Sequence, residues 1–423
     1  MTHHATMPVA PASASASAAA HDLPAPSAEA LAHSQQVLRA VETAIDQAGG
    51  WIPFSQYMDL ALYAPGLGYY SAGARKLGAA GDFTTAPEST PLFGQTLAHV
   101  IAPLLRDGLP AILEVGAGSG ALAASLLGEL ERLDALPERY EILEVSADLR
   151  ERERDTLTRS VPHLIERVSW LNGLPPAFRG VVIGNEVLDA MPVERLCWQP
   201  DGTVLRGGVS RLIGGSTHLA DDPHGDLQMS FRPFDAGTPE TLRAAATAIG
   251  HRLGPLEARY TSEVGLAACG FVRALAGHLD QAVCLFIDYG FPGAEFFHPQ
   301  RSEGTLMCHY RHRAHDDVLR WPGLQDITAH VDFTAIADAV DAAGCELLGY
   351  SSQAHFLIAG GLTDLLAQTP ATDALHYLPR SNAAQRLISP AEMGELFKVI
   401  GFARGWHGPL PAFAAGNRLA RLG

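Results

Sequence analysis

Lysine is nearly absent from this sequence. Its 423 residues include 30 Lys and Arg against 46 Asp and Glu, a formal net charge of −16, and only Lys76 and Lys398 are lysines. Polyanionic partners need a basic surface, so this balance argues against nucleic acid and against an anionic membrane as partners. A cationic substrate is still compatible with it. The apolar fraction of 47% suits a buried core and argues against disorder over most of the chain.

Cysteine is scarce too, and long hydrophobic runs are missing. The five cysteines are scattered, odd in number and form no CxxC pair, as is typical of reduced, buried thiols. No apolar run approaches the roughly 20 residues that span a bilayer. Residues 1–32 are an Ala/Ser/Pro tract without Lys or Arg, which fits neither a secretory signal nor a mitochondrial presequence. We therefore predict a disordered tail over 1–32, a cytoplasmic location, and no structural disulfide or zinc site.

Structure is expected to begin near Ser34, with a helix over 34–48 and a short amphipathic helix within 51–63. From 111 onward, strands and helices alternate, which implies a parallel sheet with helices on both faces. The expected strands lie at 111–116, 140–145, near 165–171 and 180–185, and the expected helices at 119–132 and 147–159. Residues 193–235 indicate an inserted hairpin region. The elements expected after it are helices near 238–252 and 263–277, a strand over 282–290, a helix near 333–343 and a strand at 345–350, and the last ~60 residues are left unplaced.

The segment ILEVGAGSG runs from an apolar strand into Gly116, Gly118 and Gly120 and then into a helix. Glycine permits the sharp turn and the close approach of a ligand, although the same pattern satisfies a dinucleotide fingerprint or a turn without a ligand. Two carboxylates favour S-adenosyl-L-methionine (SAM) over NAD. Glu114, inside the strand, would repel a pyrophosphate but suits a cationic ligand. Glu144, ending the next strand, can accept both ribose hydroxyls of NAD and of SAM alike, but SAM has no phosphate and carries a sulfonium and an ammonium, so acidic residues around the glycine loop fit it better.

The segment GNEVLDAMP ends the fourth strand of the expected sheet. Ligands bind at the carboxyl ends of parallel strands, so Asn185, Glu186 and Asp189 should lie near the reactive end of the cofactor. Glu186 and Asp189 would share a face if the segment forms a helical turn, and two carboxylates can hold a guanidinium bidentately. The alternative is structural: Asp189 caps a helix and Asn185 fixes a loop.

Two later segments are expected at the same edge of the sheet. Asp288 ends the next buried strand, and alternation over 326–333 would place four polar side chains on one face: Asp326, Thr328, His330 and Asp332. His330 is a candidate general base, or it hydrogen-bonds a loop. Three histidines at 309, 312 and 315 lack the carboxylate or cysteine pattern of a metal site, so no metal is predicted. The absence of a GxSxG motif argues against that kind of hydrolase.

The ordered set of motifs resembles the MidA family of class I SAM-dependent methyltransferases. That family includes the mitochondrial assembly factor that methylates an arginine on a subunit of respiratory complex I. The resemblance runs from about residue 34 to at least 350 and rests on the following motifs: MDLALYAPGLGYY, GDFTTAPESTPLFG, ILEVGAGSG, YEILEVSADLR, GNEVLDAMPVERL, FIDYG and GTLMCHYRHRAHDDVLRWPGLQDITAHVDF.

The resemblance implies an α/β fold: a Rossmann-like seven-stranded class I methyltransferase sheet with an N-terminal helical lid and an inserted α+β subdomain. The chain then divides into a tail (1–32), N-terminal helices with a cofactor-covering loop (33–110), a core (111–192 and 263–423) and an insertion (193–262). SAM is the implied cofactor, and the implied binding residues are Asp82, Phe83, Thr85, Pro87, Glu88, Glu114, Gly116, Gly118, Gly120, Glu144 and Asn185. The candidate catalytic residues are Asn185, Glu186, Asp189 and His330.

The leading hypothesis is an enzyme that transfers a methyl group from SAM to an arginine nitrogen of a protein. A hypothesis from a different class is an assembly chaperone that holds SAM as a structural ligand. An NAD-dependent oxidoreductase is a weaker alternative, disfavoured by Glu114. The expected partner is a protein that presents an arginine, and the oligomeric state stays open, with a homodimer as one option.

Overall fold

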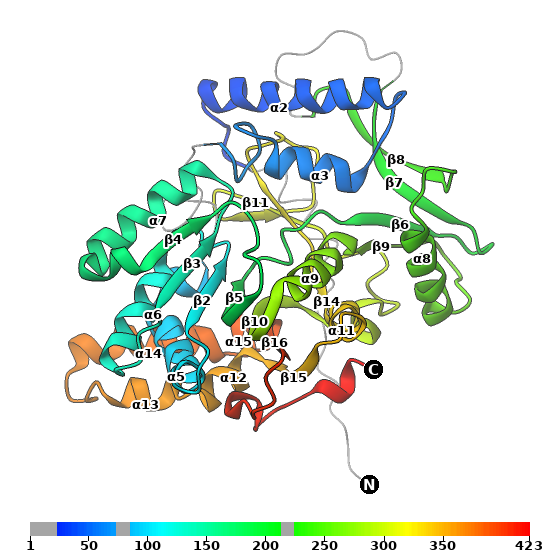
Figure 1. Cartoon of the computed structure of the whole chain (residues 1–423). Coiled ribbons are helices and arrows are strands. Elements are labelled where there is room, and N and C mark those ends of the chain that lie inside the picture. The colour runs from blue at the N-terminus through cyan, green and yellow to red at the C-terminus, as the bar shows by residue number, and fades with distance from the viewer. Residues whose placement is uncertain (1–22, 73–84, 213–223) are drawn as a thin grey trace.

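The computed structural model describes residues 23–72, 85–212 and 224–423. At its centre lies a mixed β-sheet in which β16 (Phe397–Arg404) is antiparallel to both of its neighbours, while the other neighbouring strands are parallel to one another (Figure 1). A short strand, β14 (Val331–Asp332), pairs with the end of β10 (Leu279–Phe291). From one edge of the sheet to the other, the remaining strands are β15 (Glu346–Ser352), β16 (Phe397–Arg404), β10 (Leu279–Phe291), β5 (Phe178–Asn185), β2 (Ala111–Val115), β3 (Arg139–Leu143) and β4 (Val168–Leu171).

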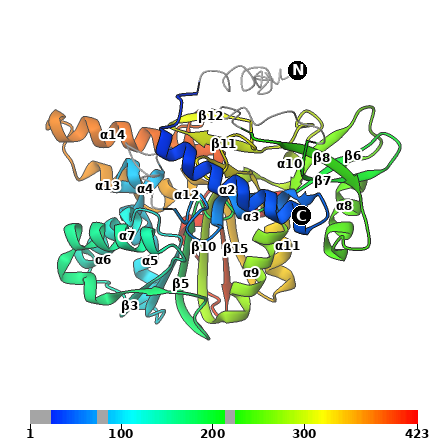
Figure 2. The ribbon, with the colours of Figure 1, turned by 90° about the horizontal axis from the view of Figure 1, so that it is seen from above.

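Helices cover both faces of this sheet (Figure 2). Val181 and Ile183 of β5 belong to the hydrophobic cluster on one face, and Val182 belongs to the cluster on the other. Burial on both sides explains why the strands read as continuous apolar runs. One face carries α5 (Leu92–Arg106), α6 (Ala121–Arg132) and α7 (Ala147–Ser160), and the other carries α9 (Leu266–His278) and α11 (Phe333–Ala342).

A second layer lies above the carboxyl ends of the parallel strands (Figure 1). Its helices α2 (Ala28–Gln47) and α3 (Phe54–Tyr63) pack on a five-stranded antiparallel sheet and share a hydrophobic core with a three-stranded sheet. The first sheet contains β1 (Ile52–Pro53), β7 (Val204–Arg211), β6 (Glu194–Trp198), β9 (Tyr260–Val264) and β8 (Leu227–Pro233). The second contains β12 (Arg313–His315), β11 (Met307–Tyr310) and β13 (Asp326–Thr328), and α8 (Glu240–Leu253) precedes β9.

The first helix begins earlier than the sequence predicts. α2 starts at Ala28, capped by the Ser27 side chain, which accepts a hydrogen bond from the Ala30 N–H at 3.2 Å. The predicted start at Ser34 is therefore wrong, and residues 28–32 of the predicted tail are helical. Alanine is the strongest helix former and serine is a good N-cap, so an Ala/Ser-rich segment can be helical when its apolar residues find a core.

Two other boundaries also differ from prediction. Residues Pro162–Arg167 form a 3₁₀ helix, so β4 covers only the end of the predicted strand at 165–171. The strand β9 crosses the predicted end of the insertion at 262, and α9 starts at Leu266. All five residues of β9 are buried, although Thr261, Ser262 and Glu263 are polar. Those polar residues hide the strand from a hydrophobicity pattern.

The segment that the sequence left unplaced completes the central sheet. β16 lies between β10 and β15, and four helices precede it against the edge of the core. They are α12 (Gln353–Ala359), α13 (Leu362–Ala367), α14 (Ala374–Ile388) and α15 (Met393–Leu396). Short helical turns also occur at α10 (Gly293–Phe296), at η3 (Pro411–Phe413) and at η4 (Leu419–Arg421).

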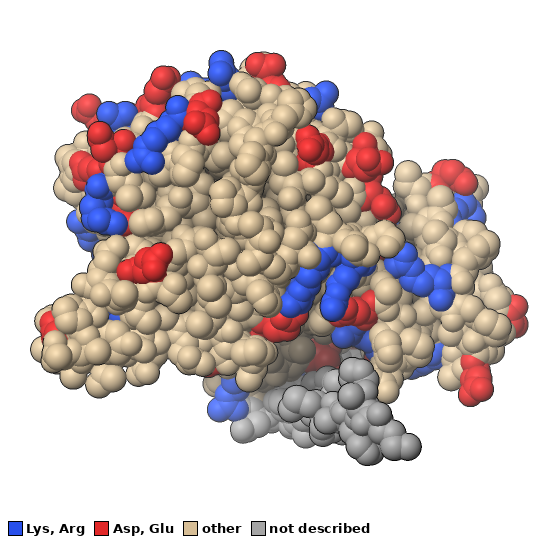
Figure 3. Space-filling view, turned by 90° about the horizontal axis from the view of Figure 1, so that it is seen from below, with Lys and Arg blue, Asp and Glu red and all other residues tan. Residues whose placement is uncertain are grey.

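The surface charge, the lengths of the helices and the state of the cysteines can be compared with the expectations drawn from composition. On the face seen from below, Lys and Arg lie among Asp and Glu instead of forming a continuous basic surface (Figure 3). Within the described ranges, no helix is both long and apolar enough to cross a membrane. All five cysteines are buried and free, as predicted.

Candidate active site

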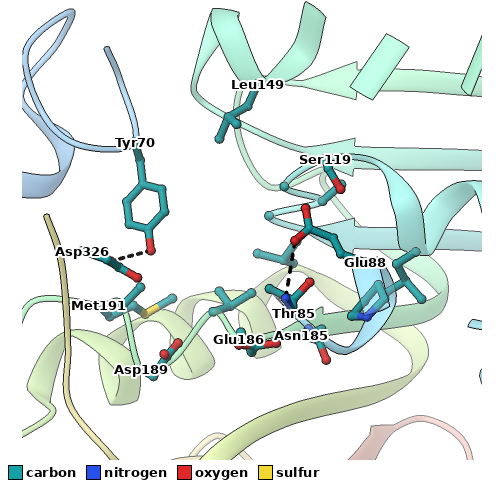
Figure 4. A pocket seen from close by; sticks show the side chains of 18 of the residues that line it. Tyr70, Thr85, Glu88, Ser119, Leu149, Asn185, Glu186, Asp189, Met191 and Asp326 are labelled. Carbon is teal, nitrogen blue, oxygen red and sulfur yellow. Dashed lines mark hydrogen bonds between the residues drawn. The ribbon is translucent and has the colours of Figure 1, made fainter. Parts of the chain in front are cut away.

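A cavity of ≈ 690 Å³ lies at the carboxyl ends of the parallel strands, beneath the second layer (Figure 4). Its walls come from the ends of β2, β3 and β5, from the segment after α3, and from the three-stranded sheet. This is the place where ligands bind in open α/β sheets, because the connections diverge there and leave a crevice.

The glycine loop forms one wall of the cavity. Gly116 and Gly118 have φ values of 64° and 60°, a left-handed backbone that glycine adopts without steric cost. Both residues line the cavity together with Ala117 and Ser119, so a ligand can approach the main chain there. The local signal in the sequence was sufficient to locate this wall.

Gly120 has a different role from the one predicted. It does not line the cavity. It is the N-cap of α6 with φ 78°, and a Cβ atom at this position would lie 3.0 Å from the Cα atom of Glu153 in α7. Gly120 therefore allows two helices to approach closely, which is why a glycine pattern alone cannot separate ligand contact from packing.

Two predicted carboxylates lie on the same wall. Glu114 lies within β2, is 2% exposed, and accepts a hydrogen bond from the Tyr140 hydroxyl at 2.6 Å. Burial raises the pKa of Glu114 to about 7. Glu144 follows β3 and accepts a hydrogen bond from the Ser146 N–H at 2.7 Å, and burial raises the pKa of this carboxyl as well. Both side chains line the cavity, and their role in binding the cofactor stays a prediction.

Asn185, Glu186 and Asp189 lie together on the floor of the cavity (Figure 4). The segment is a bend followed by a turn, not a helical turn, and Glu186 has φ 55°. Non-glycine residues seldom adopt this backbone, and such strain often marks functional sites. The Asn185 side-chain amide donates a hydrogen bond to Glu186 Oε1 at 3.1 Å. Burial, together with the charge of Asp189, raises the pKa of Glu186 to about 8.

Asp288 supports this segment from below. The sequence placed it at the edge of the site, but it is fully buried and does not line the cavity. Its Oδ2 atom accepts hydrogen bonds from the N–H groups of Val187 at 3.1 Å and Leu188 at 2.8 Å. Burial and the neighbouring Asp189 raise the pKa of Asp288 well above its usual range, because two buried acids side by side resist double ionisation.

The segment 326–333 only partly follows the predicted alternation. β13 ends at Thr328 and β14 begins at Val331, so the strand is interrupted and the polar residues do not share one face. Asp326 and His330 line the cavity. Asp332 does not, because it caps α11 by accepting hydrogen bonds from the Thr334 N–H at 3.1 Å and the Ala335 N–H at 3.3 Å.

His330 lies between two aromatic rings. The ring centroid of Tyr289 is 5.2 Å away and that of Phe291 is 5.3 Å away. Burial and the nearby Arg301 lower the pKa of His330 to about 4. The imidazole is therefore neutral at neutral pH, and it is a weak base.

The segment expected to cover the cofactor is partly described. Thr85, Pro87 and Glu88 line the cavity at the start of α4 (Ala86–Ser89), where the Thr85 N–H donates to Glu88 Oε2 at 3.4 Å in a capping box. The predicted residues Asp82 and Phe83 lie outside the described residues. Sequence reasoning did not identify several other lining residues: Tyr63, Tyr70, Met191, Tyr289, Met307 and His309.

The cavity is strongly acidic. No Lys or Arg is found among the described residues that line it, and burial lowers the pKa of His309 as well as that of His330. Its six carboxylates belong to Glu88, Glu114, Glu144, Glu186, Asp189 and Asp326. The described part of this cavity offers no cationic side chain to neutralise a pyrophosphate, whereas it suits the sulfonium and ammonium groups of SAM. The described residues contain no cluster of His, Cys, Asp or Glu that could hold a metal ion.

The strand order, the glycine loop and the acidic cavity together define a class I methyltransferase fold with a site suited to SAM. A family model described as "Putative S-adenosyl-L-methionine-dependent methyltransferase" matches residues 96–351, more than half of the chain. The chain belongs to this family, and the family resemblance found in the sequence is confirmed.

Relatives and solved structures agree with this assignment. A crystal structure from Burkholderia thailandensis bound to S-adenosyl-homocysteine is 48% identical, with a TM-score of 0.86, and the match covers 94% of this chain and 100% of that one. A native structure from the same organism, also 48% identical, has a TM-score of 0.83 with the same coverage. The protein arginine methyltransferase NDUFAF7, mitochondrial, of Danio rerio is 27% identical, over 84% of this chain and 83% of that protein. The cofactor is therefore SAM, and the NAD alternative is not supported.

Proposed function

We propose that this protein transfers a methyl group from SAM to a nitrogen of an arginine side chain in a protein substrate. The observation that carries the proposal is the cavity itself, which six carboxylates line without any Lys or Arg among its described residues. Carboxylates match the planar fork of a guanidinium. The name of the relative in Danio rerio, a protein arginine methyltransferase, supports the same acceptor.

In this proposal, the ends of β2 and β3 hold the cofactor. Bound SAM supplies a methyl group on a positively charged sulfonium. The backbone at Gly116 and Gly118 admits the ligand closely, and Glu144 accepts hydrogen bonds from the ribose hydroxyls. Glu114, with its pKa near neutrality, balances the positive charge of the ligand. Asn185 at the end of β5 borders both the cofactor and the acceptor.

Glu186 and Asp189 orient the acceptor. Methyl transfer forms an N–CH₃ bond, breaks the S–CH₃ bond, and releases one proton from the nitrogen. Holding the nitrogen in line with the methyl group supplies much of the acceleration. Glu186, whose pKa is raised to about 8, is better matched to accept the proton than His330, whose pKa is about 4. A guanidinium beside Glu186 favours its ionised form.

Mass spectrometry of methylarginine in cells with and without the gene tests the proposal. Proteins from cells lacking the gene should lose specific methylarginine peptides, and purified protein with isotopically labelled SAM should restore the label to arginine. The double variant Glu186→Gln, Asp189→Asn should not restore it. A matched control is Glu151→Gln, an exposed carboxylate on α7 that does not line the cavity, which should behave like the wild type. Label on other residue types alone would overturn the arginine assignment.

The same double variant separates the enzyme from the chaperone hypothesis. If it binds S-adenosylhomocysteine, transfers no methyl group, and still supports full biological function in cells, the protein acts as a binding factor. If biological function is lost together with transfer, the enzymatic function is supported.

The partner in this proposal is a protein that presents an arginine. The cytoplasmic location and the oligomeric state, with a homodimer as one option, stay predictions. Copurification of the client with the double variant, which should bind without turnover, would identify the partner.

A further inference from the structure

Building on the proposed function, we infer that Tyr70 and Asp326 form the subsite that receives the guanidinium of the acceptor. Neither residue is among the predicted catalytic or cofactor-binding residues. The two residues are 256 positions apart in the sequence and come from different segments of the second layer, yet both line the same cavity.

The two side chains are joined by a hydrogen bond. The Tyr70 hydroxyl donates to Asp326 Oδ1 at 2.8 Å, and Asp326 is only 2% exposed. This bond fixes the direction of the Asp326 carboxylate. Asp326 is the first residue of β13 (Asp326–Thr328). A carboxylate held in one orientation loses little conformational freedom when a cation binds to it.

The position in the cavity favours the acceptor over the cofactor. In Figure 4, Tyr70 and Asp326 lie on one side, and Ser119 of the glycine loop and Leu149 lie on the other. Glu186 and Asp189 lie on the floor between these two sides. A ligand that occupies the glycine loop therefore leaves the Tyr70 side for a second molecule, within reach of the same floor.

The aromatic surroundings favour a planar cation. Tyr63 and Tyr70 stack with ring centroids 5.5 Å apart and an interplanar angle of 22°, and both line the cavity. The Tyr63 hydroxyl donates to the Ala190 carbonyl at 2.8 Å, which holds the pair against the Asp189 turn. A guanidinium can stack flat on a tyrosine ring while its edge donates two parallel hydrogen bonds to a carboxylate, whereas an ammonium group is a compact charge without a planar fork.

A second carboxylate faces the same region. Asp189 Oδ1 is buried and makes no hydrogen bond to a described residue. Asp189 also lines the cavity, and in Figure 4 the Met191 side chain lies between Asp189 and the pair formed by Tyr70 and Asp326. A guanidinium carries five N–H donors, so it can pair with Asp326 and Asp189 together.

The test is binding of Nα-acetyl-L-arginine amide to the protein saturated with S-adenosylhomocysteine, measured by ligand-observed NMR. The wild type should bind this probe more tightly than Nα-acetyl-L-lysine amide. It should not bind the neutral citrulline analogue, which has the same shape as the arginine probe.

Asp326→Asn keeps the acceptor for the Tyr70 hydroxyl but removes the charge, and it should weaken arginine binding by about 10-fold or more. Its affinity for S-adenosylhomocysteine should match the wild type, which also verifies that it is folded. Tyr70→Phe keeps the stacked ring, loses the hydrogen bond, and should weaken arginine binding several-fold. Asp338→Asn, an exposed acid on α11, should change nothing.

The two proposals fail in different ways. Equal arginine binding by the wild type and by Asp326→Asn would overturn the subsite and leave the arginine function standing. If the wild type binds S-adenosylhomocysteine but shows no preference for the arginine probe over its lysine and citrulline analogues, the proposed arginine function itself is overturned.

Discussion

Asp288 Oδ2 accepts a hydrogen bond from the backbone N–H of Leu188 at 2.8 Å, although the two residues are 100 positions apart in the sequence. The same oxygen accepts from the Val187 N–H, so one buried acid fixes the main chain between Glu186 and Asp189. Asp288 is thus a positioning residue, and the strained backbone at Glu186 is maintained by this support.

Removing Asp288 should therefore affect both stability and activity. Asp288→Ala leaves two backbone N–H groups without their acceptor in a buried site, and we expect a loss of about 2–4 kcal/mol in the free energy of unfolding. The rate of methyl transfer should also fall, through a lower kcat, because the segment from Glu186 to Asp189 loses its shape. Chemical denaturation and steady-state kinetics measure the two effects.

The conservative variant serves as the control for Asp288. Asp288→Asn keeps a side-chain oxygen at this position, and that oxygen can accept the hydrogen bonds from the Val187 and Leu188 N–H groups. We expect Asp288→Asn to retain most of the stability that Asp288→Ala loses. If the two variants are equally destabilised, the hydrogen bonds to Val187 and Leu188 are not the source of the effect.

Glu144→Ala should weaken cofactor binding. The buried carboxylate accepts the Ser146 N–H with one oxygen and lines the cavity, so we expect a loss of roughly 1–3 kcal/mol in the binding of S-adenosylhomocysteine. Isothermal titration calorimetry measures this loss. Glu151→Ala, an exposed carboxylate on α7, is the control and should bind normally. Unchanged affinity in Glu144→Ala would remove this residue from the cofactor site.

The stability of the cofactor-free protein should fall as the pH rises from about 6.5 to about 8. The pKa values of Glu114 and Glu186 are raised from 4.5 to about 7 and about 8. In this interval the folded state keeps protons that the unfolded state has released. Raising the pH therefore lowers the free energy of unfolding. His330 acts in the opposite direction, but only between its pKa of about 4 and its usual value of 6.5. Denaturant titrations at a series of pH values check the slope.

Cofactor binding should show the complementary pH dependence. A sulfonium favours the ionised form of the cavity carboxylates, so SAM binding releases protons and its affinity should rise over the same pH interval. S-adenosylhomocysteine lacks the sulfonium, so its affinity should change less. Calorimetry in buffers of different ionisation enthalpy counts the released protons. Identical pH profiles for the two ligands would contradict the role of the carboxylates.

Gly120→Ala should lower stability while leaving the cofactor site intact. The added Cβ would lie 3.0 Å from Glu153 Cα, and φ 78° is strained for alanine. We expect a loss of roughly 1–3 kcal/mol, with the affinity of the folded protein for S-adenosylhomocysteine changed less than in Glu144→Ala. Gly277→Ala in α9 meets no atom within 4 Å and should be neutral or slightly stabilising.

The glycine loop, the alternation of strands and helices, and the segment at Asn185–Asp189 were predictable because their signals are local. A loop that needs a left-handed backbone requires glycine, and a strand buried on both faces requires apolar residues, wherever the rest of the chain lies. The identity of the cofactor also followed from local signals, since Glu114 and Glu144 are placed by the two strands that carry them.

Contacts between distant segments were not predictable in this way. The sequence places Asp288 and Asp332 at the edge of the site, but the fold buries the first beneath a backbone turn and uses the second to cap α11. β16 has an ordinary apolar pattern, and nothing in it specifies insertion between β10 and β15.

The sequence by itself determined the class of fold, the cofactor and the acidic character of this protein, because these depend on residue types and short spacings. Only the tertiary structure decided which acids face the cavity, and it brought Tyr70 to Asp326 across 256 positions. Side-chain partners at that separation depend on how distant segments pack on one another within the second layer, and that packing is a property of the whole chain.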